Sequence, residues 1–417
     1  MIARGVVLGA RGGFVEACLP GARVGDGVSV AATPEPAAGH VCALDAARVF
    51  IAMHAAIGGI ARGTPVRSDP WVRTTALGSC ALGRAIDARG RPLDGGPPLR
   101  GRRVAIAPAS PSPHDRAPVR EPFWTGVRVL DGLLTIGRGA RVGIFGAPGV
   151  GKSTLLESIA GGCSADATVV GLIGERGREA QRWIDARDAR TTVVCATSDR
   201  PAAERVRATH VAMAQAAALR ARGLHVLLVL DSLARLAAAL REIAVAAGES
   251  VGRGGYPPST FAELARLVEV AGPLRAGSIT LIASVIDDGE DRDPVSDAAR
   301  SLLDGHVVLA PRLAEAGRFP AIDVPASASR TMALVARAPH VRAARVIRRA
   351  LALLDRVEDA RRLGIDPVDA PSRRAMAIEG RLEAFLRQDD GPVAAAVTLK
   401  IAGDIADCLE DSRGEHC

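Results

Sequence analysis

The sequence predicts an α/β protein in three parts: an antiparallel β domain, a central domain with a mainly parallel sheet, and a small helical domain. Three observations predict this order. Short β segments between glycine- and proline-rich turns fill residues 1–100, and apolar runs alternate with helical stretches over residues 101–342. Helix-forming residues with i, i+3, i+4 apolar spacing dominate residues 343–417.

Five short β segments are expected in the N-terminal domain, and their spacing favours a small antiparallel barrel or a sandwich. They are residues 5–8, 14–19, 28–32, 41–44 and 49–53. A polar, proline-rich connector follows over residues 107–122, and we interpret it as a domain boundary.

Six expected strands make up the central domain. They are residues 141–145, 168–173, 191–196, 225–230, 279–285 and 305–309. Each is short and largely apolar, as is typical of a strand that helices cover on both faces. Because helical stretches separate these strands, we expect a mainly parallel sheet.

Charge and cysteine content narrow the class of protein. The net charge is +7, from 53 basic and 46 acidic residues, but arginines alternate with acids along most of the chain, which argues against nucleic-acid binding. The seven cysteines are scattered and form no CxxC pair, which favours reduced thiols over a disulfide or zinc framework. The sequence has neither a long apolar run nor a signal-peptide pattern at residues 1–5, so we expect a soluble cytoplasmic protein.

A glycine-rich segment after the first central strand carries the strongest chemical signal. It matches the phosphate-binding pattern GxxxxGK[ST] with Gly146, Ala147, Pro148, Gly149, Val150, Gly151, Lys152, Ser153 and Thr154. In this context backbone N–H groups face the phosphates, Lys152 bridges them and Ser153 binds magnesium. The only other lysine is Lys400, so lysine is kept where a compact charge must fit beside phosphates. The sequence therefore predicts a site for ATP and Mg²⁺; the alternative is a coincidental glycine-rich turn.

Two acidic residues follow later strands of the predicted sheet. Asp231 ends the strand at 225–230, where a P-loop fold has the acid that holds magnesium through water. Its alternative role is the N-cap of the next helix. Glu175 follows the strand at 168–173, which we expect beside the P-loop strand, so Glu175 is the candidate general base. Its alternative is a solvated charged loop.

Residues 319–330 are not interpretable from spacing alone. Phe319 is either an ordinary core aromatic or, in a chain with only seven Phe and one Tyr, a platform for adenine. Arg330 could be an ordinary surface arginine.

Several motifs together resemble the type III protein secretion ATPases, in both the virulence injectisome and the flagellar export branches. They are Arg-Glu-Pro (120–122), Thr-Gly-Val-Arg (125–128), Gly-Glu-Arg-Gly-Arg-Glu (174–179), Leu-Asp-Ser (230–232), Gly-Tyr-Pro-Pro-Ser (255–259), Leu-Leu-Asp-Gly-His (302–306), Phe-Pro-Ala-Ile-Asp-Val (319–324) and Glu-Ala-Phe-Leu-Arg-Gln (383–388). The resemblance covers almost the whole chain. It implies an N-terminal β-barrel, a central RecA-like P-loop ATPase domain and a C-terminal helical domain, assembled as a homohexamer with its sites at the interfaces.

The resemblance also implies roles for the residues that match the family's motifs. Lys152 and Ser153 hold phosphate and magnesium, Glu175 activates water, and Arg176 touches the γ-phosphate. Glu179 and Asp231 lie in the magnesium shell, and Phe319 packs on adenine. Arg330 is the arginine finger that reaches into the site of the neighbouring subunit. The implied activity is ATP hydrolysis that releases export substrates from chaperones and energises their export.

The implied partners are stator and central stalk proteins, the membrane export gate and chaperone–substrate complexes, with no nucleic acid. The implied location is the cytoplasmic face of the inner membrane. Four features depart from the family pattern. The first is that the β domain begins close to Met1, so the amphipathic helix that binds the stator is not expected. The others are Pro325, near the loop that presents Arg330, and Ala234, where the family commonly has Leu and Thr, and the acidic loop at 287–291, which differs in detail. The first departure and the short chain favour the injectisome branch.

Four alternatives remain at this stage: a flagellar export ATPase, the catalytic subunit of a rotary ATP synthase, a non-catalytic nucleotide-binding ring subunit, and a ring-shaped RNA helicase. Glu175 argues against the non-catalytic subunit, because such subunits lack the catalytic carboxylate. The N-terminal segment lacks the aromatic pattern of a base-stacking surface, which argues against the helicase.

Overall fold

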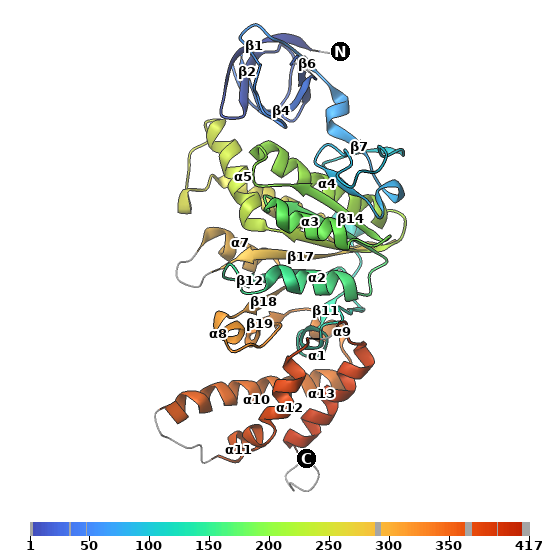
Figure 1. The fold of residues 1–417 in the computed structure, drawn as a ribbon, viewed down its shortest axis with the longest axis vertical. Coiled ribbons are helices and arrows are strands. Elements are labelled where there is room, and N and C mark those ends of the chain that lie inside the picture. The colour runs from blue at the N-terminus through green and yellow to red at the C-terminus, as the bar shows by residue number, and fades with distance from the viewer. Residues whose placement is uncertain are drawn as a thin grey trace.

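The computed structural model describes residues 3–32, 35–46, 48–287, 293–362, 369–389 and 391–410. The chain runs from a barrel at one end, through a central sheet with its helices, to a group of helices at the other end (Figure 1). Over these ranges no helix has the length and apolar character needed to cross a membrane.

The N-terminal barrel is closed by six antiparallel strands in the order β1-β2-β5-β4-β3-β6. They are β1 (Arg4–Arg11), β2 (Phe14–Cys18), β3 (Gly27–Val30), β4 (Ala37–Asp45), β5 (Arg48–Met53) and β6 (Pro65–Ser68). Val15, Val28, Val41 and Ile51 fill the interior and are fully buried. The barrel is therefore confirmed over the sandwich, and the strand that closes it, β6, is one that the sequence did not predict.

The central sheet has the order β19-β18-β12-β17-β15-β13-β14-β8, with β16 paired to β17. Its strands are β8 (Ala85–Asp87), β12 (Arg141–Gly146), β13 (Ala167–Ile173), β14 (Thr191–Ala196), β15 (His225–Asp231), β16 (Gly272–Pro273), β17 (Ser278–Ile286), β18 (Gly305–Leu309) and β19 (Ile322–Ser329). All neighbours along the path are parallel except β18 and β19, so the expected mainly parallel sheet is confirmed. The edge strand β8 comes from the range predicted for the barrel domain.

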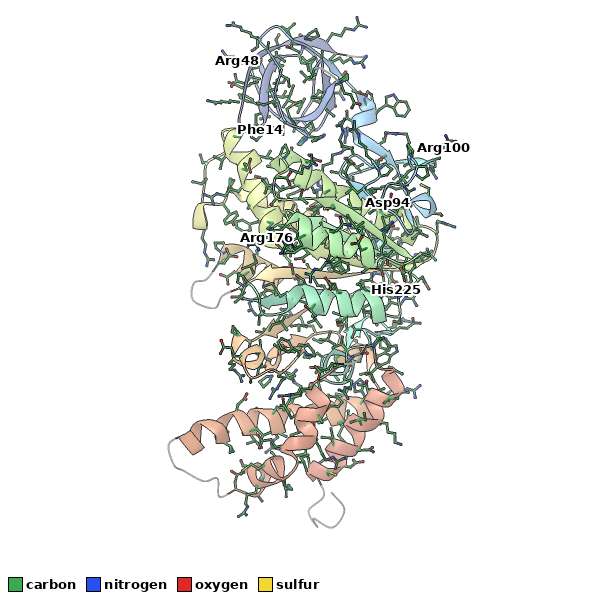
Figure 2. All side chains as sticks on the ribbon, in the orientation of Figure 1. Phe14, Arg48, Asp94, Arg100, Arg176 and His225 are labelled. Carbon is green, nitrogen blue, oxygen red and sulfur yellow. The ribbon has the colours of Figure 1, made fainter. Side chains whose placement is uncertain are left out.

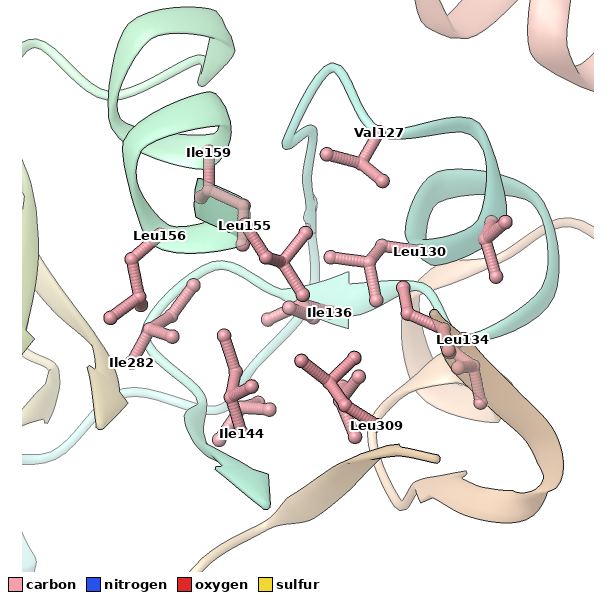
Figure 3. Packing of buried hydrophobic residues seen from close by; sticks show 14 of the residues in the cluster. Val127, Leu130, Leu134, Ile136, Ile144, Leu155, Leu156, Ile159, Ile282 and Leu309 are labelled. Atoms are coloured by element: carbon pink, nitrogen blue, oxygen red, sulfur yellow. The ribbon is translucent and has the colours of Figure 1, made fainter. Parts of the chain in front are cut away.

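Helices cover both faces of this sheet. The helices between the barrel and the C-terminal helices are α1 (Arg128–Leu133), α2 (Lys152–Gly162), α3 (Gly177–Ala186), α4 (Ala202–Arg220), α5 (Leu233–Ala246), α6 (Pro258–Val268), α7 (Pro294–Leu302), α8 (Pro311–Glu315) and α9 (Met332–Val335), of which α9 packs on β11 instead of on this sheet. On one face, Leu156 and Ile159 of α2 pack with Ile144 and Ile282 of the sheet (Figure 3). Burial on both faces explains why the strands are almost entirely apolar.

The remaining elements are short connections and the C-terminal helices. Two small antiparallel pairs join β7 (Thr74–Ala76) to β9 (Arg103–Ala105) and β10 (Pro122–Phe123) to β11 (Ile136–Gly137). Short 3-10 helices occupy Pro70–Arg73, Ser79–Ala81, Pro113–Asp115 and Arg253–Gly255. The C-terminal helices are α10 (Ala338–Arg362), α11 (Ala370–Ala377), α12 (Glu379–Leu386) and α13 (Ala395–Glu410).

The C-terminal helices share a hydrophobic core with the central domain. Phe385 of α12 is fully buried and belongs to the same cluster as Leu130 of α1. A Cβ built on Gly132 would lie only 2.8 Å from the ring of Phe385, so glycine is needed where α1 meets α12. The helical part is therefore packed directly on the segment that precedes the P-loop strand.

Candidate active site

The P-loop connects the end of β12 to the start of α2, as the motif predicts. Gly149 and Gly151 have φ angles of 83° and 99°, which residues with a side chain adopt at a cost, so these glycines allow the tight wrap. The Lys152 ammonium donates hydrogen bonds to the carbonyl oxygens of Gly146, at 2.7 Å, and Ala147, at 2.8 Å. Burial lowers the pKa of Lys152, while Asp231 and Glu175 favour its charged form. The ammonium is therefore held over the loop in a partly desolvated position.

A pocket of about 360 Å³ opens beside the P-loop at the carboxyl edge of the sheet. It brings together ten of the predicted site residues: Pro148, Gly149, Gly151, Lys152, Ser153, Thr154, Glu175, Arg176, Glu179 and Asp231. Arg176 is exposed where the chain leaves the sheet and α3 begins (Figure 2). The other loop residues, Gly146, Ala147 and Val150, support the loop without lining the pocket.

Asp231 is the last residue of β15 and is 6% exposed. Its carboxylate accepts a hydrogen bond of 2.5 Å from the Ser284 hydroxyl on the neighbouring strand β17. The N-cap of α5 is Ser232, whose side chain accepts a hydrogen bond from the N–H of Arg235. The capping alternative for Asp231 is therefore wrong, and its carboxylate faces the pocket instead.

Glu175 reaches the pocket by a route that the sequence did not predict. The expectation that its strand lies beside the P-loop strand is wrong, because β17 and β15 lie between β12 and β13. The carboxyl ends of parallel strands all lie on the same side of the sheet. Glu175 therefore still faces the P-loop, across the ends of the two intervening strands. Its side chain is buried, and Arg235 of α5 lies 3.1 Å from Oε2.

The electrostatic environment of Glu175 favours a bound proton. Burial, a hydrogen bond with Glu179 and the nearby Asp231 raise the pKa of Glu175 to about 8, while Arg235 acts in the opposite direction. Burial also raises the pKa of Asp231. A carboxyl with a pKa near neutrality can accept a proton from a nearby water, which is what a general base requires.

The oxygen donors of the pocket suit a magnesium ion. Ser153, Glu179 and Asp231 all line it, and Mg²⁺ prefers oxygen ligands while keeping several waters and substrate phosphates in its shell. Over the described ranges there is no group of three or more His, Cys, Asp or Glu that would hold a metal alone. This donor set fits an ion that a nucleotide and waters help to bind.

Phe319 lies outside the pocket lining but beside the P-loop. A Cβ built on Gly151 would be 4.0 Å from Cε1 of Phe319. The side chain is 45% exposed, so the alternative of an ordinary core aromatic is wrong. The open ring can pack against a flat ligand group beyond the loop.

Arg330 lies at the amino ends of the central parallel strands, on the side of the sheet opposite the P-loop. It follows β19, and its N–H donates to the carbonyl of Asp304 at the start of β18. In register, Gly305 pairs with Val142 at the amino end of β12, whereas the P-loop leaves the carboxyl end of that strand. Arg330 is exposed and does not line the pocket of its own chain. Pro325 lies in an irregularity of the β18–β19 ladder, which is regular again at Ala328, ahead of Arg330.

Sequence reasoning missed four polar residues of the pocket: Arg182, Ser232, Arg235 and Ser284. Arg235 lies in the first turn of α5, which begins at Leu233, two residues after Asp231 ends β15, so the same strand-to-helix connection carries both side chains to the site. Ser284 could be found only with the register, in which the preceding residue, Ala283, pairs with Leu230.

The fold and this site define a P-loop ATPase of the ATP synthase type. Residues 126–329 match the ATP synthase alpha/beta family, nucleotide-binding domain. A type 3 secretion system ATPase of Pseudomonas syringae pv. tomato is 41% identical over 92% of this chain and 89% of its own. A flagellum-specific ATP synthase of Treponema pallidum is 40% identical over 92% and 88% of the two chains.

Solved structures agree with this assignment. The assembled ATPase EscN of the enteropathogenic E. coli type III secretion system superposes with a TM-score of 0.90 and is 37% identical, covering 96% of this chain and 100% of its own. EscN in complex with its central stalk EscO superposes with a TM-score of 0.87, with the same identity and coverage. The chain belongs to the family of type III secretion system ATPases. It is a nucleotide-binding, ATP-hydrolysing enzyme.

Proposed function

We propose that this protein is the homohexameric motor of a type III secretion injectisome, in which ATP hydrolysis releases export substrates from chaperones and drives their export. The observation that carries the proposal is the separation of Arg330 from the P-loop pocket of its own chain. An arginine finger at the end of the sheet opposite the P-loop pocket can act only on the nucleotide of a neighbouring subunit. This gives the ring a role in catalysis.

The proposed chemistry assigns the pocket residues as follows. Backbone N–H groups of the P-loop and the Lys152 ammonium bind the nucleotide phosphates. Ser153, Asp231 and Glu179 would hold Mg²⁺, which neutralises charge on the phosphates when bound. Glu175 accepts a proton from the attacking water, and Arg176 contacts the γ-phosphate. Phe319 packs on the adenine ring, and the neighbour's Arg330 stabilises charge in the transition state.

The proposed assembly follows from the relatives. EscN has been solved as an assembled ATPase and in complex with its central stalk. By analogy we propose a ring of this chain that binds a central stalk, a stator, chaperone–substrate complexes and the export gate at the cytoplasmic face of the inner membrane. Flagellar export is the second candidate, because a flagellar relative is nearly as similar as the secretion relatives.

A mixing experiment tests the shared site. Lys152→Ala disables the pocket of a subunit, and Arg330→Ala disables the finger that it offers to its neighbour. Each variant alone should lose about 10³-fold in ATPase rate. In a 1:1 mixture, about one interface in four joins an intact pocket to an intact finger, so activity should return to about a quarter of the wild-type rate.

The controls follow from the same arrangement. The wild-type rate per subunit should rise cooperatively with protein concentration as rings form. A mixture no more active than its parents would contradict a finger that acts on the neighbour. Full activity of Arg330→Ala, with a rate per subunit that does not depend on concentration, would contradict the ring as well.

A further inference from the structure

The loop that carries Phe319 lies between α8 and β19, at residues 316–321, and its aromatic ring is not fixed by the hydrophobic core. The ring is 45% exposed, and even a Cβ built on Gly151 of the P-loop would lie 4.0 Å from its Cε1 atom. Its direction is therefore set mainly by the backbone of the loop. This makes the groups that hold that backbone important for any ligand that packs on the ring.

An ion network ties the loop to the carboxyl end of α12. The guanidinium of Arg318 contacts both carboxylate oxygens of Glu383, at 3.1 Å and 2.6 Å, a two-point geometry that fixes direction as well as distance. Arg387 donates to the same carboxylate at 2.8 Å and reaches the carbonyl of Ala316 at 3.5 Å. Burial opposes ionisation of Glu383, but the hydrogen bonds from Arg387 and Arg318 outweigh it and hold its pKa below the usual value.

Gln388, the next residue along, makes the direct contact with Phe319. Its N–H donates to the Phe319 carbonyl at 2.9 Å. Its side-chain oxygen accepts from the N–H of Arg128 at 2.8 Å, and its side-chain nitrogen donates to the carbonyl of Gly126 at 2.8 Å. Gln388 thus joins the Phe319 loop to the segment that leads into α1.

The helix under these contacts, α12, is packed in the hydrophobic core. Leu382, Phe385 and Leu386 anchor α12 in the core that α1 and the sheet share, and all three are buried. Because packed cores resist small displacements, a shift of α12 must carry the loop with it.

We propose that Glu383, Arg387 and Gln388 are positioning residues that hold the Phe319 ring where the nucleotide base binds, so that the helical domain sets the affinity for the base. The inference rests on the proposed role of Phe319. It also predicts a reciprocal effect: a partner that displaces α12 weakens nucleotide binding, and bound nucleotide weakens that partner by the same factor.

The test compares a ligand that has a base with one that lacks it. Dissociation constants for MgADP and for magnesium tripolyphosphate are measured by calorimetry on the full chain, with the variants Glu383→Gln, Gln388→Ala and Phe319→Ala. Glu410→Gln is the matched control, since it breaks an ion pair with Arg342 between α10 and α13, away from the loop.

We expect the variants to weaken binding of MgADP but not of magnesium tripolyphosphate. Phe319→Ala should weaken MgADP about tenfold, in the range that base stacking contributes, and Glu383→Gln and Gln388→Ala about fivefold each. Tripolyphosphate affinity should change by less than about twofold in every case, because the P-loop is untouched. KM for ATP should rise while kcat stays within about twofold, since only binding of the base is lost.

Any other outcome would contradict either the positioning role of these residues or the adenine-binding role of Phe319. If Phe319→Ala weakens MgADP but Glu383→Gln and Gln388→Ala both bind it like wild type, the positioning role is wrong and the proposed function stands. If Glu383→Gln and Gln388→Ala weaken tripolyphosphate as much as MgADP, their effect is a general disturbance and the positioning role is again wrong. If Phe319→Ala has no effect, the adenine platform itself is wrong. Glu383→Gln keeps the test available should Gln388→Ala fail to fold.

Discussion

Arg235 forms an ion pair with the proposed general base, so its replacement should change the pH at which the enzyme works. At 3.1 Å from Oε2 of Glu175, a full charge would contribute about 5 kcal/mol at an effective dielectric constant of about 20. The Arg235 side chain is 34% exposed, and solvent screening reduces this to about 1.5–3 kcal/mol, or about one to two pKa units. Arg235→Gln should raise the pKa of Glu175 by that amount.

The direction in which the pH dependence of kcat/KM shifts follows from the role of Glu175. A base must be ionised to accept a proton, so kcat/KM rises with pH until the pKa of Glu175 is passed. Loss of Arg235 should move this rise to higher pH by about one to two units. At a fixed pH below the rise, the variant should be about 10- to 100-fold slower, and the two enzymes should converge in alkaline buffer.

The assay is phosphate release under kcat/KM conditions from about pH 6 to 10, a range that spans the expected rise. Arg182→Gln is the control. Arg182 lines the same pocket, but its ion pair is with Glu157, at 3.9 Å, so the position of the rise should not change. A uniform loss of rate in Arg235→Gln, with the rise at the wild-type pH, would refute the proposed effect of Arg235 on Glu175.

Three further predictions concern the phosphate loop, the helical core and the barrel. Lys152→Arg should reduce ATPase activity at least about 100-fold despite its charge, because a guanidinium is too broad for the carbonyl contacts of Lys152; steady-state rates and MgADP calorimetry would check this. Phe385→Ala should lower the free energy of unfolding, measured with urea, by about 3–5 kcal/mol. Leu334→Ala, at a 67% exposed site, should lower it by no more than about 0.5 kcal/mol, and equal losses would contradict the packing of α12. Burial, with nearby His210 and Arg207, lowers the pKa of His40 to about 4, so the unfolded chain binds the proton first and stability falls as pH drops below 6.5. His40 should contribute about 2 kcal/mol to the loss from about pH 7.5 to 5, in addition to its neighbour His54, whose pKa is also lowered, so the loss should be smaller in His40→Gln.

The expected strands of the central sheet were predictable because their pattern is unambiguous. A strand buried on both faces is apolar throughout, and the helices between these strands leave few other arrangements. The strands β6 and β8 were missed for the opposite reason. β6 contains Pro65 and two polar residues, and β8 is three residues long, so neither shows an alternating or continuous apolar pattern.

The site residues that belong to one local motif were predictable from the sequence. Those whose position depends on the order of strands in the sheet were less so. The P-loop is continuous in sequence, so its nine residues follow from the motif alone. The neighbours of β13 depend on crossovers that sequence spacing does not encode, which is why the position of Glu175 was predicted from a wrong strand order. Ser284 and Arg235 meet the predicted acids only through register and helix phase.

The two edges of the central sheet also determine how copies of this chain can meet. Exposed strand edges pair readily with other chains and can propagate into open-ended aggregates. Here β19 contains Pro325, which lacks an N–H, in an irregular part of its ladder, and β8 on the other edge has only three residues. Backbone pairing between sheets is therefore disfavoured, so the subunits of the proposed ring would recognise one another through side chains. Contacts of that kind would form and separate with each cycle without trapping the protein in a fibre.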